Sequence, residues 1–221
     1  LTALATNRIA ERVSAAMGMP SVFKLVIGAD EVVGTRLVAD RRVPLISATG
    51  SCRMGRAVGQ VVAGRLGRTL LELGGNNGII VTESADQDLA LKSVVFGAVG
   101  TAGQRCTTTR RLILHESIAA KFMDRLVAAY KTIRLGDPLV EGTLVGPLIN
   151  ARSVDLFLSA VNLAKQQGGK VLVGGDRAKV QGLKGYFVQP TIVRAPESNR
   201  LAVAQDETFA PILYVFTYKD L

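Results

Sequence analysis

The sequence predicts an α/β fold. Short apolar runs typical of strands alternate with stretches of helical periodicity, a pattern that favours strand–helix–strand units around a parallel sheet. The 221 residues are 48% hydrophobic, which is enough to fill a substantial core. The paired glycines Gly74-Gly75, followed by two asparagines, interrupt the alternation. We therefore expect two domains, residues 1–73 and residues 74–221.

The first domain is expected to be part of a nucleotide-binding sheet. Residues 2–18 have apolar residues at helical spacing and end at Gly18, so the chain opens on a helix. The β-rich apolar runs that follow are typical of strands in a buried parallel sheet. The expected elements are helices at 2–18, 31–39 and 54–65 and strands at 22–27, 43–47 and 69–73.

The second domain continues the alternation around a glycine-rich loop at residues 97–104. The expected elements are helices at 85–97, 117–133 and 154–167 and strands at 78–82, 110–115, 170–175, 186–193 and 211–218. The sequence starts inside a helix and stops just after an apolar strand. We therefore expect sequence to be missing at both ends, with the second domain incomplete at its C-terminus.

Composition and charge exclude several classes of protein. Two cysteines are too few for a disulfide framework and fit a reducing compartment, so we predict a cytoplasmic location. The net charge is +9, but the basic residues are spread along the chain and aromatic residues make up 5%, so no nucleic-acid surface is predicted. The uncharged stretch at 93–104 is too short to cross a membrane. No metal site is predicted.

Cys106 is the candidate nucleophile. It follows a glycine-rich loop, and glycines let the backbone approach a ligand closely. A thiol beside a cation such as Arg105 ionises more readily, and the thiolate is the form that attacks a carbonyl. A free cysteine is more often an inert core residue, but the polar, glycine-rich flanks argue against a packed position here.

Glu72 is the candidate general base. It ends an apolar strand directly before Gly74-Gly75, so we expect it to be partly buried at a domain seam. Desolvation favours the protonated form of a carboxylate, which suits base chemistry near neutral pH. A structural glutamate that pairs with an arginine or a backbone N–H is an equally good interpretation.

A third candidate is the turn from Thr49 to Gly55, which follows an expected strand and opens a helix. Its glycines would let a dinucleotide's phosphates approach the helix N-terminus, where unpaired N–H groups favour anions. Alone this signal is weak, because strand–glycine–helix turns are common as simple connections.

Taken together, four stretches in this order resemble the aldehyde dehydrogenase family. They are LELGGNN (71–77), GQRCTTTRR (103–111), TGS with a later glycine (49–55) and DETFAPIL (206–213). The resemblance covers essentially the whole chain, and its details are most similar to the α-aminoadipic semialdehyde dehydrogenase (antiquitin) branch. It implies an aldehyde dehydrogenase-like fold, with part of a Rossmann-type cofactor domain followed by an α/β catalytic domain.

The resemblance also implies an activity and a set of roles. The protein would oxidise an amino-acid semialdehyde in lysine catabolism, using NAD, with NADP not excluded, and would form a homo-oligomer, a dimer or tetramer. Cys106 would be the nucleophile and Glu72 the base, while Arg105 and Thr107 would contact substrate. The implied cofactor residues are Gly28, Ala29, Thr49, Gly50, Ser51, Gly55, Leu73, Glu207 and Phe209.

The sequence departs from the family's pattern in two respects. The K-P-S-E segment, which holds the adenosine ribose, and the P-W-N segment, whose Asn helps to bind the oxyanion, would both precede Leu1. Removing one oxyanion donor typically costs about 10²–10³ in rate, so the 221-residue chain alone is expected to be weakly active or inactive. Cys52 stands where the family more usually has Thr.

The sequence also allows two other functions. The chain could be a catalytically inactive fragment that serves only as a binding or oligomerisation module. His115, the single histidine, could instead pair with Cys106 in a Cys–His hydrolase. The second is disfavoured, because a straight strand would carry His115 far from the thiol at about 3.3 Å per residue.

Overall fold

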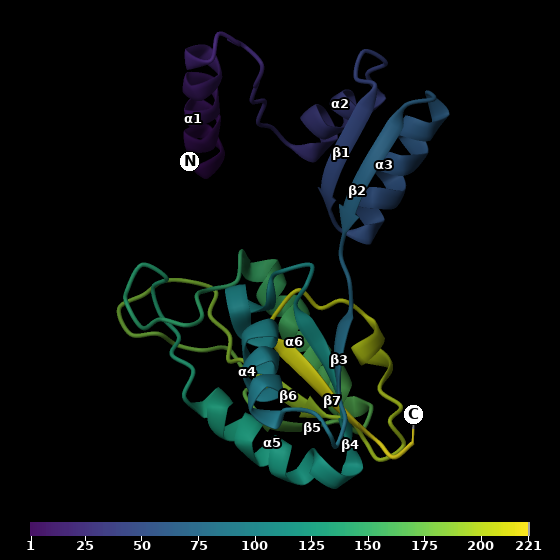
Figure 1. Cartoon of the computed structure of the whole chain (residues 1–221), viewed down its shortest axis with the longest axis vertical. Helices are drawn as coiled ribbons and strands as arrows, with labels where there is room; N and C mark the ends of the chain where they lie inside the picture. The colour runs from purple at the N-terminus through teal and green to yellow at the C-terminus, as the bar shows by residue number, and fades with distance from the viewer. Residues whose placement is uncertain (221) are drawn as a thin grey trace. The chain divides into compact units, whose positions relative to one another are not determined.

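The computed structural model describes residues 1–220 and divides the chain into two compact units, Leu1–Leu73 and Gly74 onward. The mixture of helices and strands confirms the α/β class (Figure 1). The functional role of each unit stays a prediction.

The first unit is built on one strand–helix–strand motif. Strands β1 (Leu45–Gly50) and β2 (Arg68–Leu73) pair in parallel, with Thr49 opposite Glu72, and α3 (Cys52–Gly64) connects them and packs on one face of the pair. The other helical segments are α1 (Thr2–Ala16), a π-helical turn (Asp30–Gly34) and α2 (Thr35–Ala39). The parallel pairing and the expected helices are confirmed.

Two expectations for this unit are wrong. Residues 22–27 form no strand, because no ladder with another strand of residues 1–220 pairs their backbone groups, and Val26 and Ile27 are exposed. The sheet is also not buried: most residues of β1 and β2 are half-exposed or exposed, since α3 covers one face of two strands.

The second unit contains a five-stranded sheet in residues 74–220, in the order β3-β4-β7-β6-β5. Its strands are β3 (Asn77–Val81), β4 (Thr109–His115), β5 (Lys170–Val173), β6 (Thr191–Arg194) and β7 (Ile212–Tyr218). All neighbouring pairs are parallel except β5 and β6. The strand expected at 186–193 begins only at Thr191, because Pro190 has no N–H to donate to a ladder.

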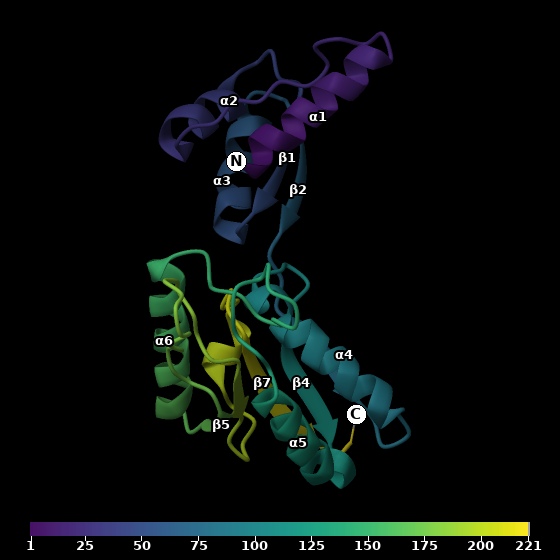
Figure 2. The same cartoon turned by 90° about the vertical axis from the view of Figure 1, so that its left-hand side faces the viewer.

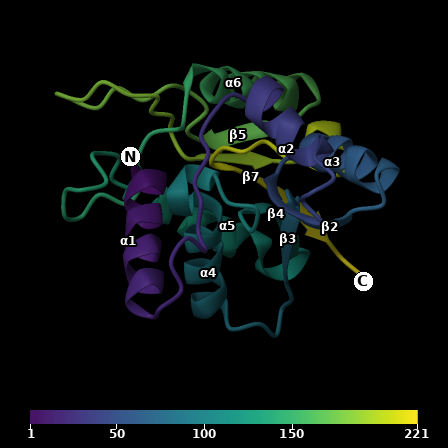
Figure 3. The ribbon, with the colours of Figure 1, turned by 90° about the horizontal axis from the view of Figure 1, so that it is seen from above.

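Helices cover both faces of this sheet. They are α4 (Gln87–Val99), α5 (Glu116–Lys131) and α6 (Ala151–Gln166), with short 3₁₀ turns at Gly100–Gly103 and Ala202–Gln205. Figures 2 and 3 show α4 and α5 on one face and α6 on the other. The helices begin at side-chain caps, such as Asp86 for α4 and Asn150 for α6.

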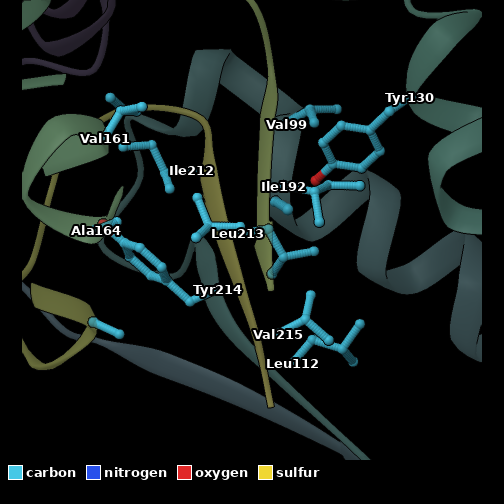
Figure 4. Close-up of a cluster of buried hydrophobic side chains, with 14 of the residues drawn as sticks. Val99, Leu112, Tyr130, Val161, Ala164, Ile192, Ile212, Leu213, Tyr214 and Val215 are labelled. Atoms are coloured by element: carbon cyan, nitrogen blue, oxygen red, sulfur yellow. The ribbon is translucent and has the colours of Figure 1, made fainter. Parts of the chain in front are cut away.

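The core of the second unit lies between these layers. Figure 4 shows Leu112, Ile192 and Leu213 from three adjacent strands, and Tyr130 of α5 beside Ile192 in the same buried cluster. Burying each such side chain stabilises the fold by about 1.5–3 kcal/mol, so the central strands are firmly held. The strands therefore give the loops at their ends a rigid support. No helix in residues 1–220 is both long and apolar enough to cross a membrane.

Candidate active site

Cys106 lies in an exposed turn between the Gly100–Gly103 3₁₀ segment and the start of β4. The backbone before it is strained: Thr101 and Ala102 have φ of 55° and 53°, and Gly103 continues in the left-handed region at 69°. Such conformations cost about 1–3 kcal/mol each for residues other than glycine and cluster at functional sites. The surrounding contacts must therefore hold this turn in place.

One of those contacts is with the 206–213 loop. A Cβ added at Gly103 would lie 2.6 Å from the backbone nitrogen of Pro211 and would overlap Ala210. The positive φ favours glycine here, and the close approach of the backbone requires it. The turn that carries Cys106 therefore rests directly on the segment that carries Glu207 and Phe209.

The Gly74-Gly75 step and β3 supply a second set of contacts. Asn77 Nδ2 donates to the backbone oxygens of Cys106, at 2.8 Å, and Thr108, at 3.1 Å. The Gly75 N–H donates to Glu207 Oε1 at 3.1 Å, and a Cβ added at Gly74 would lie 2.6 Å from Glu207 Cδ. Three segments far apart in the sequence thus meet around Cys106 within one unit.

Arg110 joins these segments, although no sequence motif marks it as a site residue. Its guanidinium is 1% exposed and donates to the carbonyl oxygens of Thr108 (2.9 Å) and Arg105 (3.3 Å). It also pairs with Glu207 Oε1 at 3.4 Å. Burial lowers the pKa of Arg110, while its interactions with Glu207 and Cys106 act in the opposite direction. The available signal was an arginine inside an apolar strand, since a buried arginine needs several partners.

Glu207 and Phe209 lie beside Arg110. The Glu207 side chain is 23% exposed and its carboxylate is held by Gly75 and Arg110. Phe209 is half-exposed, with the Arg110 guanidinium carbon 5.4 Å from its ring centre. Both side chains therefore border the Cys106 turn and remain accessible from solvent.

Arg105 and Thr107 flank Cys106 in the chain. The Arg105 guanidinium lies over the Phe96 ring of α4, at 4.9 Å, and donates to the Phe96 carbonyl at 3.1 Å. Thr107 is exposed in the turn. Lys92 and Thr143 line a groove with Arg105 and Phe96, so this edge of the turn carries positive charge beside apolar surface.

The remaining site candidates belong to the first unit. Glu72 is exposed in β2, which belongs to a two-stranded sheet that α3 covers on one face, and its expected burial at a domain seam stays a prediction. Gly28 and Ala29 precede the π-helical turn, where the Ala29 carbonyl accepts from Val32 and Val33. A Cβ at Gly28 would overlap the Val33 side chain.

The turn from Thr49 to Gly55 joins β1 to α3. Ser51 caps the helix by accepting from the Met54 N–H at 3.1 Å. A Cβ added at Gly55 would lie 2.6 Å from a methyl of Leu73, so glycine permits the close packing of α3 on β2. The first turn of α3 contains Arg53 and no acidic residue, which suits an anion.

The structure disfavours the Cys–His hydrolase. His115 ends β4 and Cys106 precedes its start, so the seven-residue strand separates them by about 20 Å. The His115 ring is instead held by Ser117 Oγ at 2.7 Å and Glu83 Oε2 at 3.1 Å. Its role is to begin α5, where it accepts from the Ser117 N–H.

Comparison with known proteins gives a consistent result. The family model described as "Aldehyde dehydrogenase family" matches residues 1–221. Aldehyde dehydrogenase family 7 member A1 of Pisum sativum is 51% identical over 88% of this chain, and alpha-aminoadipic semialdehyde dehydrogenase of Mus musculus is 52% identical over 87%. The chain spans 37% and 35% of the lengths of these two relatives.

Solved structures show the same likeness. Betaine aldehyde dehydrogenase of Staphylococcus aureus, in complex with NAD+, has a TM-score of 0.84 and 31% identity over 89% of this chain and 39% of its own. HpcC of Thermus thermophilus has a TM-score of 0.88 and 37% identity over 96% of this chain and 42% of its own.

Proposed function

This chain belongs to the aldehyde dehydrogenase family, and we propose from that premise that the protein containing it oxidises an aldehyde to the carboxylate with NAD(P). The substrate class we favour is an amino-acid semialdehyde such as α-aminoadipic semialdehyde, an intermediate of lysine catabolism. This choice is supported by relatives of that name, which are 50–52% identical to this chain.

Cys106 is the nucleophile in this proposal. Its thiolate adds to the aldehyde carbon to give a thiohemiacetal, and loss of hydride from that carbon leaves a thioester on the sulfur. NAD supplies the hydride acceptor. Water then attacks the thioester, with Glu72 taking its proton, and the products are the carboxylic acid and free Cys106. Arg105 and Thr107 would contact the substrate's polar groups.

The residues present fit a dinucleotide. The capped N-terminus of α3, with Arg53 in its first turn and no acid, suits phosphates at Thr49, Gly50 and Ser51. Gly55 and Leu73 let this helix pack closely on β2. Glu207 would hold the nicotinamide ribose with Phe209 beside it, and Gly28 and Ala29 would flank the adenine.

One observation carries the proposal: the Cys106 turn, the Gly74-Gly75 step and the Glu207 loop converge within one unit. Gly75 bonds Glu207, Asn77 bonds the Cys106 carbonyl, and Gly103 packs against Pro211. This convergence brings the proposed nucleophile into the same unit as Glu207 and Phe209, the two residues proposed to hold the nicotinamide ribose. An inert packed cysteine would be buried, whereas Cys106 is exposed.

The test is NADH formation by the complete protein with α-aminoadipic semialdehyde and NAD+. We expect Cys106→Ala to abolish turnover, and turnover that survives would refute the assignment of the nucleophile. Glu72→Gln should slow thioester hydrolysis, so that a burst of NADH precedes slow turnover. A folded protein that forms no NADH with aldehydes would support the inactive binding module instead.

Two further properties belong to the proposal. The complete protein is expected to be a homo-oligomer, a dimer or tetramer, which sedimentation would measure. We place it in the cytoplasm, because two cysteines are too few for a disulfide framework and fit a reducing compartment. Fractionation of cells that express it would test the location.

A further inference from the structure

Arg110 stands in β4, but the contacts of its side chain are with the Cys106 turn and the Glu207 loop. Besides Thr108 and Arg105, its guanidinium reaches the carbonyl oxygens of Gly103, at 3.5 Å, and Thr208, at 3.3 Å. Three of these oxygens belong to the turn and one to the Glu207 loop. A buried charge with this many acceptors fixes the backbone on both sides of Cys106.

Glu207 is the acidic partner of this guanidinium and is itself fixed. Its Oε1 accepts from Gly75 and lies 3.4 Å from Arg110 Nη2. Cys106 stands in the turn whose carbonyl oxygens bind Arg110, and its interaction with Arg110 acts to raise the pKa of that guanidinium. A thiolate at Cys106 and the Glu207 carboxylate would therefore share the charge of one arginine.

Other groups around the turn complete the electrostatic setting. Arg105 adjoins Cys106 in sequence, but its guanidinium lies on Phe96. Asp206 precedes Glu207 in the loop, and β3 presents the neutral Asn77 to the Cys106 carbonyl. Within this setting, Arg110 is joined directly to the turn, and Glu207 is joined to Arg110.

We propose that Arg110 is a positioning residue for Cys106, and that Glu207 opposes it, so that the two side chains change the reactivity of the thiol in opposite directions. Arg110 holds the turn through the turn's carbonyl oxygens, so its positive charge lies against the backbone on both sides of Cys106. Glu207 neutralises part of that charge. The proposed function enters only through the identification of Cys106 as the nucleophile.

The experiment measures alkylation of Cys106 by iodoacetamide in the complete protein, across a pH series, from the labelled peptide by mass spectrometry. The thiolate is the reactive form, so the rate at neutral pH reports the local charge. We expect Arg110→Met to slow alkylation about tenfold and Glu207→Gln to accelerate it several-fold, up to about tenfold. The pH of half-maximal rate should rise in the first variant and fall in the second.

A merely structural role would not produce opposite signs, because loosening of the turn exposes the sulfur in both variants. Arg110→Lys, which keeps the charge without the planar guanidinium, should recover part of the rate lost in Arg110→Met. Arg177→Met is the matched control: it removes an exposed arginine that pairs with Asp155 in the same unit, and should leave the rate unchanged.

The outcome decides the proposal in each case. Shifts of the same sign, or no shift in folded variants, would overturn it. If thermal melting shows that Arg110→Met does not fold, Glu207→Gln alone carries the test: faster alkylation supports the proposal and an unchanged or slower rate refutes it. Alkylation needs neither aldehyde nor NAD+, so these results stand whether or not the protein forms NADH.

Discussion

Gly103 packs closely between the Cys106 turn and the 206–213 loop. We predict that Gly103→Ala costs about 2–5 kcal/mol of unfolding free energy. The added methyl meets the positive φ of 69°, worth about 1–2 kcal/mol, and the backbone of Ala210 and Pro211, worth about 1–3 kcal/mol. Urea unfolding measures the loss, and alkylation of Cys106 would report the displaced turn.

Gly182 provides the control for this prediction. It shares a positive φ of 76°, but an added Cβ there would meet no atom within 4 Å. Gly182→Ala should therefore cost about 1–2 kcal/mol, from backbone conformation alone. Equal losses in the two variants would show that the contact with Pro211 contributes nothing.

Tyr214 of β7 predicts a pH dependence of stability. Burial raises the pKa of Tyr214 from 10.0 to about 12. Because the folded state favours the neutral phenol, its contribution is complete below pH 10 and is lost as the pH rises toward 12. The shift corresponds to about 2–3 kcal/mol. Urea unfolding between pH 10 and pH 12 should show that the unfolding free energy falls less steeply with pH in Tyr214→Phe than in the unchanged protein.

Tyr130 of α5 serves as the comparison for that measurement. Burial raises the pKa of Tyr130 as well. Tyr130→Phe should therefore also reduce the fall of the unfolding free energy at alkaline pH. Lysine titration contributes equally to all of these proteins and cancels in the comparison. If the unfolding free energy falls equally with pH in Tyr214→Phe and in the unchanged protein, the pH dependence does not come from Tyr214.

Single residues were predictable from sequence where a motif marks them and not where their role depends on the fold. Cys106, Glu207 and Phe209 stand in recognisable motifs. Arg110 and Asn77 do not, because their importance arises from carbonyl oxygens that the chain brings to them only after folding. The roles of all these residues stay predictions until the variants are measured.

At the scale of elements, α4 leads directly into the strained backbone before Cys106. The capping of its N-terminus should therefore contribute to the stability of the second unit. Asp86 Oδ1 accepts from the N–H groups of Asp88 and Leu89, both at 3.0 Å. We predict that Asp86→Ala lowers the unfolding free energy by about 1 kcal/mol. Asp86→Asn should retain most of that stability, since asparagine caps about equally well. Urea unfolding of the two variants is the measurement, and equal losses would argue against capping.

Element prediction succeeded where the signal is local and failed where it is not. The helices at 85–97 and 117–133 carry periodicity and end signals in their own sequence, and α4 and α5 lie there. The apolar run at 22–27 has the composition of a strand, but a strand needs a partner ladder, and residues 1–220 provide none. Pairing of this kind is not encoded in a six-residue window.

At the scale of the whole molecule, the two units differ sharply in their cores. The buried residues of Leu1–Leu73 are Ser14, Ile46, Gly55 and Val62. From Gly74 onward the core is continuous across a five-stranded sheet with helices on both faces. The division lies at the Gly74-Gly75 step, where paired glycines favour a break in regular structure. Sequence therefore indicated where a boundary lies, but not that the first unit would bury so little.

This contrast predicts different behaviour of the separated units. Residues 74–221 expressed alone should unfold cooperatively in urea with about 5 kcal/mol or more, because a single large core supports a two-state transition. Residues 1–73 alone should show no cooperative transition, since a two-stranded sheet under one helix buries too little apolar surface. Leu112→Ala in the larger fragment should cost about 2–5 kcal/mol, which verifies that its transition reports the core in Figure 4. A cooperative transition in the smaller fragment would mean that it forms a core that the exposed faces of β1 and β2 do not show.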